Sequence, residues 1–445
     1  MSAPERPSPA YGAALARLVG SSSPGMRLGL ESTRRLMSLL GDPQLALRGV
    51  LVAGTNGKGS VSAMTAEMAL RAGHQVALLT KPHLTSYRER FRLGGEPIDE
   101  ALFAEVAAAV CDAADAMAAD QTRPTHHELL TGMGFLAAQR WGAEVVICEV
   151  GLGGRLDATN VWDGGIKVLT SISLDHQAQL GNTVLEIARE KSAVIKPGNL
   201  VVAGVGPLAL PAVTAAARLA PARLWLLERE VRLRRGPDQT SGFSVETPAG
   251  LRDNLRLSLD GPFQLENAAL AVAAADCLSE SGVQIGEEAI RAALLEVEWP
   301  GRLQRIAGSP EVLVDAAHNP SAVAALLPVL AGELAARPSV LLFGAMDDHD
   351  HGGMLRLLGE LPFQEGVFTR ARSARAADPT ALVQVWSGRS HVVEPVASAL
   401  ARARKLAGSG GLVVALGSIY VIGEVMSELG LGLPRDPEVS FPPLW

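Results

Sequence analysis

Short apolar runs and longer amphipathic segments alternate along almost the whole chain. The short runs have the length and the branched residues of buried strands. They cover residues 50–53, 76–79, 145–150, 166–172, 200–203, 312–314, 340–343 and 412–416. Between them apolar residues recur at helical spacing, as they do after the first run and again around 268–278 and 287–295. Strands that alternate with helices predict parallel sheets covered by helices, so we expect the α/β class.

A turn at Trp299-Pro300-Gly301-Arg302 interrupts this alternation. Adjacent proline and glycine favour a turn between two folding units, and a second series of strands and helices follows them. We therefore predict two domains. A larger domain with a mostly parallel sheet is expected over residues 1–298, and a smaller, Rossmann-like α/β domain over residues 299–445.

The composition is that of a globular protein, with 48% hydrophobic and 20% charged residues in a chain of 445. A net charge of −7 argues against a nucleic-acid partner, which would need a basic face. The three cysteines are odd in number and widely spaced. This excludes a disulfide framework and a C-x-x-C metal site, and it fits a reducing compartment. Residues 199–217 carry no charge, but glycines and prolines interrupt them, so we expect strand, loop and helix there. Residues 1–10 lack the pattern of a secretory signal, and we expect a soluble, cytoplasmic protein with no membrane partner.

A glycine-rich segment, Gly54-Thr55-Asn56-Gly57-Lys58-Gly59-Ser60, follows the first strand and opens the first helix of the pattern. A strand, a glycine turn and a helix N-terminus direct several backbone N–H groups and the positive end of the helix dipole at one point. Lys58 adds a cation, and Ser60 adds a hydroxyl that can ligate magnesium. The spacing differs from G-x-x-x-x-G-K-[ST], because Val52 stands at the first glycine and the serine follows the lysine by two positions. We predict a P-loop-type site for the phosphates of a nucleoside triphosphate.

Polar residues stand where two further predicted strands end. Glu149 lies at the end of the run 145–150, and Asp175 and His176 follow the run 166–172. Ligands of open parallel sheets bind at the carboxyl ends of the strands, so these groups are expected beside the phosphate loop. A carboxylate there can hold the Mg²⁺ that bridges phosphate oxygens, and the histidine can be a further ligand or a donor to phosphate.

Three other segments favour ordinary structural roles when their residues are considered alone. A capping-box pattern at 183–186 and the pair Pro197-Gly198 mark the two ends of a predicted helix. Lys191 lies on this helix between apolar neighbours, a position typical of a surface lysine whose stem packs on apolar side chains. Residues 347–351 have the spacing of a metal site but are expected to form a solvated loop. The pair His126-His127 lacks a third ligand at a suitable spacing, so a zinc site is not expected.

The motifs, taken in order, resemble those of the folylpolyglutamate synthase/dihydrofolate synthase family, which belongs to the Mur ligase superfamily. The resemblance runs from about residue 28 to about residue 423 and is most specific in 149–160, a segment that the cell-wall Mur ligases lack. Besides that segment and the phosphate loop, it rests on Leu174-Asp175-His176, Glu190-Lys191, Pro300-Gly301-Arg302, Asp315-Ala316-Ala317-His318-Asn319-Pro320 and Gly417-Ser418-Ile419-Tyr420.

The resemblance implies an ATP-dependent ligase in which ATP phosphorylates a carboxylate and the α-amine of L-glutamate attacks the acyl phosphate. The acyl substrate would be dihydropteroate, a reduced folate or both, and the family also implies a monomer. The implied ATP contacts are Thr55, Asn56, Gly57, Lys58, Gly59, Ser60, Asn267, Arg302 and Asp315. The implied Mg²⁺ ligands are Ser60, Glu149 and His176, and the implied catalytic residues are Lys58, Glu149, His176 and Lys191. Lys191 matches a lysine that the family carbamylates, which reverses its assignment to the surface.

The implied substrate contacts are Thr125, His127, Glu128, Arg155, Asp157, His318 and Asn319, the last two at the cleft where glutamate is expected. Three positions depart from the family pattern. His127 replaces a phenylalanine that packs against the pterin, and Asp348-His349-Asp350 replaces an Asp-Lys-Asp segment. Lys81 replaces a serine that ligates magnesium. A charged ammonium cannot ligate a cation, so Thr80, a water molecule or a different arrangement of the metal would take the place of that serine.

Two other functions fit the same motifs. Another Mur-type ligase would use a different acyl substrate, and activity with a UDP-linked muropeptide but not with pteroates would favour it. A non-catalytic nucleotide-binding relative, inactivated by the substitution at Lys81, would bind ATP but release no phosphate with pterin and glutamate. A P-loop kinase or GTPase is disfavoured, because the chain has no guanine-reading N-K-x-D element.

Overall fold

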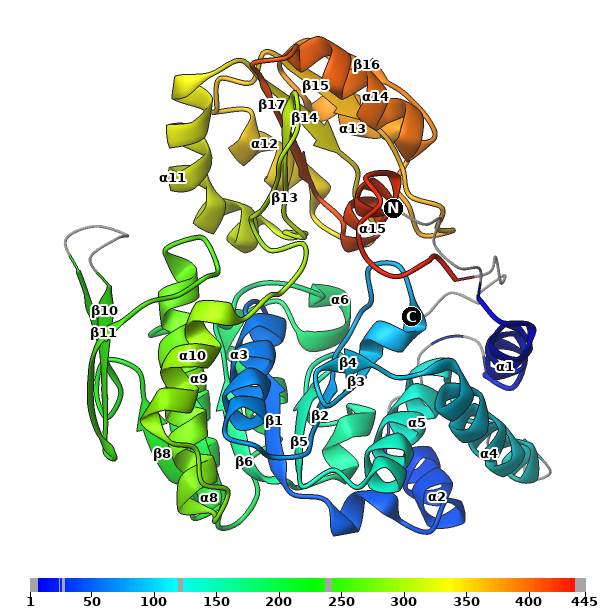
Figure 1. Cartoon of the computed structure of the whole chain (residues 1–445), viewed down its shortest axis with the longest axis vertical. Helices are drawn as coiled ribbons and strands as arrows, with labels where there is room; N and C mark the ends of the chain where they lie inside the picture. The colour runs from blue at the N-terminus through cyan, green and yellow to red at the C-terminus, as the bar shows by residue number, and fades with distance from the viewer. Residues whose placement is uncertain (1–6, 24, 26–28, 119–122, 237–241, 437–445) are drawn as a thin grey trace.

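The computed structural model describes residues 7–23, 25, 29–118, 123–236 and 242–436. Within them the chain forms an eight-stranded sheet, a three-stranded sheet and a six-stranded sheet. The eight-stranded sheet lies in the lower part of Figure 1, and the six-stranded sheet, built from the last third of the chain, lies in the upper part. The α/β class predicted from the hydrophobic pattern is confirmed.

The eight-stranded sheet has a parallel centre and one antiparallel edge. Its strands are β1 (Gly49–Ala53), β2 (Val76–Leu79), β3 (Phe91–Leu93), β4 (Glu96–Pro97), β5 (Val145–Glu149), β6 (Gly165–Leu169), β7 (Leu200–Ala203) and β8 (Arg223–Leu226). Their order is β4-β3-β2-β5-β1-β6-β7-β8, and neighbours pair in parallel except at β2–β3 and β3–β4. Because β1 lies between β5 and β6, the loops that follow these three strands emerge side by side.

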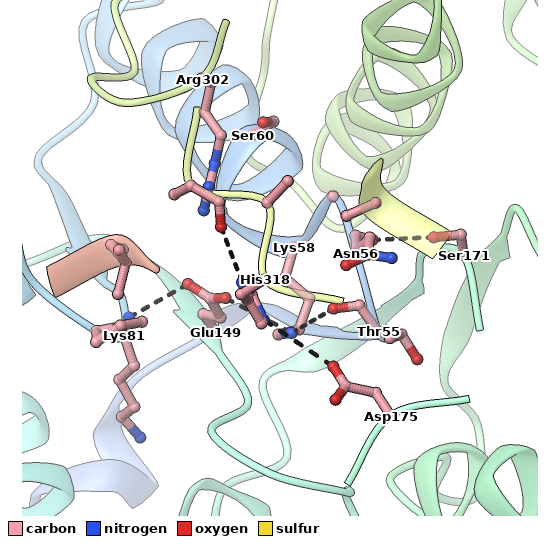
Figure 2. Close-up of a pocket in the computed structure, with 18 of the residues that line it drawn as sticks. Thr55, Asn56, Lys58, Ser60, Lys81, Glu149, Ser171, Asp175, Arg302 and His318 are labelled. Atoms are coloured by element: carbon pink, nitrogen blue, oxygen red, sulfur yellow. Dashed lines mark hydrogen bonds and ion pairs between the residues drawn. The ribbon is translucent and has the colours of Figure 1, made fainter. Parts of the chain in front are cut away.

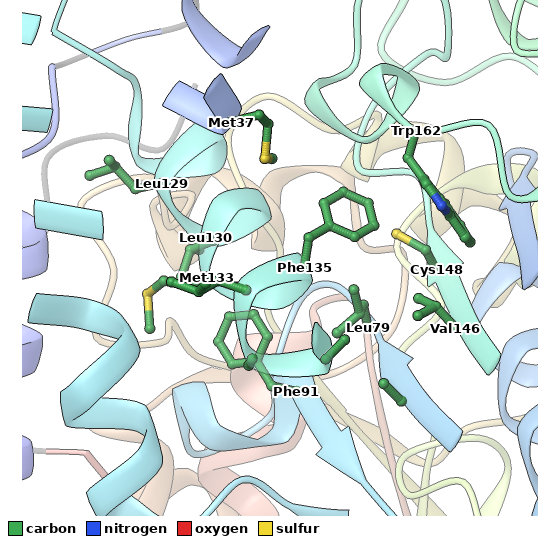
Figure 3. Packing of buried hydrophobic residues seen from close by; sticks show 14 of the residues in the cluster. Met37, Leu79, Phe91, Leu129, Leu130, Met133, Phe135, Val146, Cys148 and Trp162 are labelled. Atoms are coloured by element: carbon green, nitrogen blue, oxygen red, sulfur yellow. The ribbon is translucent and has the colours of Figure 1, made fainter. Parts of the chain in front are cut away.

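Helices cover both faces of this sheet because its central strands are apolar on both sides. On β1, Leu51 and Ala53 face one hydrophobic cluster, and Val50 and Val52 face another. The first cluster is covered by α1 (Pro9–Gly20), α2 (Glu31–Leu39), α4 (Glu100–Ala118), α5 (His126–Trp141) and α8 (Leu210–Leu219). The second is covered by α3 (Lys58–Arg71), α9 (Phe263–Glu280) and α10 (Glu287–Glu296). Figure 3 shows the first cluster, in which Phe135 of α5 packs over the sheet.

Shorter elements shape the rim of the large sheet. They are α6 (Gln177–Leu180), α7 (Val184–Ser192) and the 3₁₀ turns η1 (Pro43–Ala46), η2 (Tyr87–Arg90) and η3 (Ala158–Val161). A capping box formed by Thr183 and Glu186 opens α7 as predicted. The helix ends at Ser192, before the proline-glycine pair that was expected to close it.

The three-stranded antiparallel sheet is an addition to the predicted elements. It consists of β9 (Arg232–Arg235), β10 (Phe243–Thr247) and β11 (Gly250–Leu255). Phe243, Val245 and Leu255 are buried in the same cluster as α9, whereas arginines and other polar residues fill most of the remaining positions. So few apolar positions give no clear strand pattern in the sequence.

The six-stranded sheet is parallel except at one edge. Its strands are β12 (Gln304–Ile306), β13 (Glu311–Val314), β14 (Ser339–Phe343), β15 (Glu365–Phe368), β16 (Ser390–Val392) and β17 (Leu412–Leu416), in the order β12-β13-β17-β14-β15-β16. Only β12 pairs in the antiparallel direction among these described strands. One face is covered by α11 (Pro320–Ala336), α12 (His351–Leu358) and α13 (Pro379–Val385), the other by α14 (Val396–Ala407) and α15 (Ile419–Glu428).

The eight apolar runs predicted as strands coincide with β1, β2, β5, β6, β7, β13, β14 and β17, so these predictions are confirmed. The uncharged residues 199–217 form β7, a loop and most of α8, as expected. Among the described residues, no helix has both the length and the apolar character that crossing a membrane requires. The helix α10 ends at Glu296, and β12, the first strand of the six-stranded sheet, begins at Gln304. The domain limits 1–298 and 299–445 stay a prediction.

Candidate active site

A cavity of about 390 Å³ opens where the two large sheets face each other. Its walls come from the loops after β1, β5 and β6 and from the loops after β13, β14 and β17. Both sheets thus present the carboxyl ends of parallel strands to one space, which is where such sheets bind ligands. In Figure 2 the side chains of Lys58, Glu149 and His318 converge in this space.

The phosphate loop is built to hold an anion. Gly57 has a left-handed φ of 87° and directly precedes α3, whose first residue is Lys58. A Cβ at Gly57 would lie 2.4 Å from Asn267 Oδ1, so a side chain would clash with α9. Lys58 Nζ donates to Thr55 O at 3.0 Å and therefore stays within the loop. The N-terminus of α3 and this ammonium together favour negative charge at the mouth of the loop.

The three residues implied as magnesium ligands, Ser60, Glu149 and His176, all line the cavity wall. The Ser60 hydroxyl and the Glu149 carboxylate are oxygen donors of the kind that Mg²⁺ prefers, and the His176 imidazole adds a nitrogen donor. Glu149 Oε1 lies 4.0 Å from Lys58 Nζ, and burial raises the pKa of Glu149 against the opposing effect of this cation. Burial lowers the pKa of His176, so its imidazole is neutral at pH 7, as a metal ligand must be. In the described part of the chain, no group of three or more Cys, His, Asp or Glu side chains can hold a metal ion by itself. The set fits Mg²⁺, which takes further ligands from phosphate and water.

Lys191 of α7 is 5% exposed, and its Nζ donates to Gly54 O at 2.8 Å. The surface position expected from the local pattern is wrong, because this side of α7 packs against the phosphate loop. Burial, followed by the charge of Lys58, lowers the pKa of Lys191 to about 7. A neutral amine is the form that acts as a nucleophile, so this environment agrees with carbamylation. The carbamylation itself stays a prediction.

Arg302, Asp315 and His318 reach the cavity from the last third of the chain. Asp315 accepts hydrogen bonds from Ala317 N and Leu303 N, each at 2.7 Å. Burial raises the pKa of Asp315, and Arg302 opposes this effect. Burial lowers the pKa of His318 to about 4, which leaves its imidazole neutral at pH 7.

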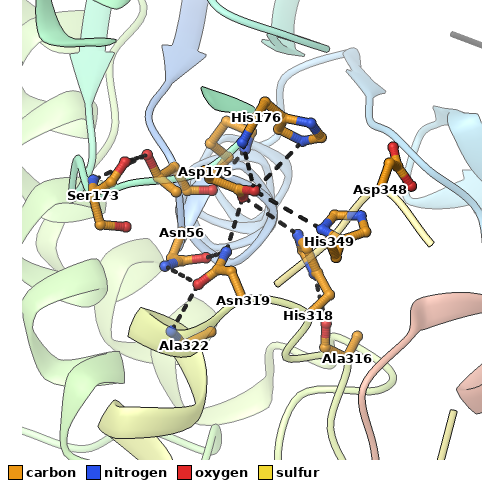
Figure 4. Close-up of polar contacts among 12 residues, drawn as sticks. Asn56, Ser173, Asp175, His176, Ala316, His318, Asn319, Ala322, Asp348 and His349 are labelled. Atoms are coloured by element: carbon orange, nitrogen blue, oxygen red, sulfur yellow. Dashed lines mark hydrogen bonds and ion pairs between the residues drawn. The ribbon is translucent and has the colours of Figure 1, made fainter. Parts of the chain in front are cut away.

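A group of polar side chains joins the phosphate loop to the last third of the chain (Figure 4). The side-chain amides of Asn56 and Asn319 exchange hydrogen bonds of 3.3 Å and 3.0 Å. Asn319 Nδ2 also donates to Asp175 Oδ2 at 3.0 Å. His318 Nε2 and His349 Nδ1 lie 4.0 Å and 3.9 Å from the oxygens of the same carboxylate. Asp175 therefore faces three groups from the other side of the cavity.

The solvated loop predicted for residues 347–351 is wrong at its centre. Asp347, Asp348 and Asp350 are exposed as expected, but the side chain of His349 is only 8% exposed and lines the cavity. Its ring packs near the rings of His176 and His318, with centroid distances of 5.4 Å and 5.1 Å. Spacing alone cannot indicate this burial, because the partners come from distant parts of the chain.

Comparisons with known proteins agree with this geometry. The family described as "Mur ligase, glutamate ligase domain" matches residues 301–419. A dihydrofolate synthase/folylpolyglutamate synthase of Bacillus subtilis is 32% identical over 430 residues, which cover 91% of this chain and 96% of that protein. The chain belongs to the dihydrofolate synthase/folylpolyglutamate synthase family.

Two further similarities extend this result. A probable bifunctional folylpolyglutamate synthase/dihydropteroate synthase of Haloferax volcanii is 37% identical over 89% of this chain, which spans 48% of that longer protein. A solved structure of the bifunctional folylpolyglutamate synthase/dihydrofolate synthase of Yersinia pestis, complexed with AMPPNP and Mn ion, has a TM-score of 0.83 and is 28% identical. That similarity covers 97% of this chain and 99% of that one.

Every residue that the family resemblance implies as an ATP contact lines the cavity. Of the implied folate contacts in 125–157, only His127 does so. Thr125 and Glu128 form the capping box of α5. Arg155 is exposed, and its guanidinium lies 3.0 Å from the carboxylate of Glu190. Asp157 lies behind His127, whose Nε2 is 3.0 Å from Asp157 Oδ2. The contact of these residues with a substrate stays a prediction.

Several cavity residues are absent from the set that the resemblance implies. Lys81, Arg90, His126 and Tyr420 all line the cavity. Lys81 has a signal in the sequence through its departure from the family pattern. Tyr420 belongs to a motif of that pattern, and His126 belongs to the histidine pair, whereas no motif in the sequence indicates Arg90. His126 Nε2 lies 3.0 Å from Tyr87 Oη, so the turn η2 and α5 are linked at this wall.

Proposed function

We propose that this protein is an ATP-dependent ligase that adds L-glutamate to dihydropteroate, to reduced folates or to both. The observation that carries the proposal is the single cavity onto which the phosphate loop, the candidate magnesium ligands and groups from the last third of the chain all open. We assign ATP and folate to the side formed by residues 1–298 and the ligation of glutamate to the side formed by residues 299–445. A monomer in the cytoplasm completes the proposal, and three free, buried cysteines fit that compartment.

The reaction proceeds in two steps. A carboxylate oxygen of the acyl substrate bonds to the γ-phosphorus of ATP, and ADP leaves. The amine of glutamate then attacks the acyl carbon and loses a proton, inorganic phosphate leaves, and an amide remains. When bound, Mg²⁺ neutralises charge on the phosphate oxygens.

The side chains of the cavity orient the reactants and balance their charge. Lys58 and the N-terminus of α3 hold the phosphates and stabilise the negative charge of the transferred group. Arg302 approaches the same space from the opposite wall. We assign the entry of glutamate to the side of His318 and Asn319. His318 lines the cavity and is neutral at pH 7, and a neutral imidazole can accept the proton that the amine of glutamate loses.

The decisive experiment measures ADP release with dihydropteroate and with tetrahydrofolate separately, each with and without glutamate. We expect release that requires both an acyl substrate and glutamate, and a product whose mass has increased by one glutamyl residue. Nucleotide binding without phosphate release would identify a non-catalytic relative. Turnover with a UDP-linked muropeptide alone would identify a different Mur-type ligase.

A further inference from the structure

Two cationic side chains on one wall of the cavity have no carboxylate partner within the described residues. Lys81 Nζ makes one hydrogen bond, 3.4 Å long, to Thr131 Oγ1. Arg90 is 6% exposed, its Nε donates to His83 Nδ1 at 2.8 Å, and its guanidinium lies 4.9 Å from the centre of the Tyr87 ring. Cations removed from water are normally paired with an anion, because an isolated buried charge is costly.

The carboxylates that act on Lys81 are occupied elsewhere. Glu149 faces Lys58 and accepts a hydrogen bond from the backbone N of Lys81. Asp157 accepts hydrogen bonds from Leu152 N and from the backbone and hydroxyl of Thr159, and it lies 3.0 Å from His127 Nε2. Neither carboxylate makes a hydrogen bond or an ion pair with Lys81 Nζ, whose one hydrogen bond goes to Thr131, so this ammonium can still pair with a carboxylate of a ligand.

Lys81 and Arg90 lie on the wall of the cavity that begins at the candidate magnesium ligand Glu149, close to where the reacting carboxylate of the substrate must bind. Lys81 N donates to Glu149 Oε2 at 3.2 Å, so the backbone of this lysine lies beside the candidate magnesium ligand. Its side chain extends away from Glu149 (Figure 2). Thr80 N donates to Arg90 O at 3.1 Å, which places Arg90 next to Lys81 along the same wall. The charged ends of these two side chains therefore lie along a wall that starts at Glu149 and leads away from it.

We propose that Lys81 and Arg90 bind a carboxylate of the acyl substrate other than the one that is activated, so that the enzyme prefers folates that already carry glutamate over dihydropteroate. This inference rests on the proposed function. Dihydropteroate has a single carboxylate, which reacts. A folate ends in glutamate and has two carboxylates, of which one reacts. The other is separated from it by a short saturated chain, and the length of this chain is comparable to that of the lysine side chain. Charge-assisted hydrogen bonds to that second carboxylate would compensate both cations.

The first test compares kcat/KM for tetrahydrofolate and for dihydropteroate at saturating ATP, Mg²⁺ and glutamate. We expect the unaltered enzyme to prefer tetrahydrofolate by about tenfold or more, as a charged hydrogen bond allows. Lys81→Met should reduce this preference by about tenfold, mainly through a higher KM for tetrahydrofolate, and Lys81→Arg should retain most of it. Lys405→Met, which removes an exposed lysine on α14, is the matched control and should leave the preference unchanged.

The second test needs no variant. A tetrahydrofolate analogue whose α-carboxylate is converted to a primary amide should have a kcat/KM about tenfold lower than tetrahydrofolate with the unaltered enzyme. Equal values for the analogue and tetrahydrofolate would overturn the inference, and so would an equal loss on both acyl substrates in Lys81→Met. In either case glutamylation itself would persist, so the proposed function would stand. Absence of ADP release with every acyl substrate would instead overturn the proposed function, and this inference with it.

Discussion

Replacing Lys191 with methionine should stabilise the protein at pH 7 while it removes activity. Burial lowers the pKa of Lys191 from 10.5 to about 7. At about 1.4 kcal/mol per pH unit, this difference corresponds to about 5 kcal/mol of destabilisation by the buried charge. Methionine removes that cost but also the hydrogen bond to Gly54 O, whose loss costs about 2 kcal/mol. We therefore expect the free energy of unfolding to rise by about 3 kcal/mol at pH 7.

The pH dependence identifies the cause of this change. Between pH 7 and pH 10.5 the unfolded chain binds a proton at Lys191 that the folded chain has lost. The stability of the unaltered protein therefore rises with pH across this window, by about 1.4 kcal/mol per pH unit from this group. The methionine variant lacks this contribution. Its advantage should fall from about 3 kcal/mol at pH 7 to about zero near pH 9.5.

Urea unfolding followed by circular dichroism at the two pH values measures this difference. The buffers must be free of carbon dioxide, so that the lysine is not carbamylated. Lys405→Met, at an exposed position, should change stability by less than about 0.5 kcal/mol and serves as the control. A Lys191→Met protein that is less stable than the unaltered protein at pH 7, or a difference that does not vary with pH, would refute the reasoning.

Three further predictions concern the reaction. Lys58→Ala should abolish ADP release, because it removes the charge that neutralises the transferred phosphate; near-normal activity would contradict the phosphate-loop assignment. Glu149→Gln should raise the Mg²⁺ concentration for half-maximal activity by about tenfold or more, and an unchanged titration would exclude Glu149 from the metal site. Lys191→Ala should lose activity that short carboxylic acids partly restore, by supplying the negative charge of the missing carbamate. A fully active alanine variant would show that this lysine has no role in the reaction.

The strands and the phosphate loop were predictable because their signals are local. All five residues of β1 are buried, so the run is apolar throughout, and the glycines that follow mark the turn into α3. The sheet formed by β9, β10 and β11 lacks such a signal, because only a few of its positions face α9. A pattern of hydrophobic residues predicts an element only where one side of it is continuously buried.

The sequence predicted the ATP side of the candidate site and the folate side to different degrees. The ATP contacts follow sequence motifs and all line the cavity, since motifs of this kind are short and keep their geometry. On the folate side, Thr125 and Glu128 cap α5 and do not line the cavity, and their contact with a substrate stays a prediction. His349 was expected in water, yet it packs against groups that lie far from it in the chain.

By itself, the amino-acid sequence determined the α/β alternation with its eight apolar strands, the phosphate loop and the family to which the chain belongs. Only the tertiary structure decided which charges are buried and which are paired. It placed Lys191 beneath the phosphate loop, His349 against Asp175, and Lys81 on a wall without a carboxylate partner among the described residues. The physical reason is that secondary structure follows periodicity over neighbouring residues. Electrostatic free energy depends on distance and dielectric environment, which are set only when distant segments meet.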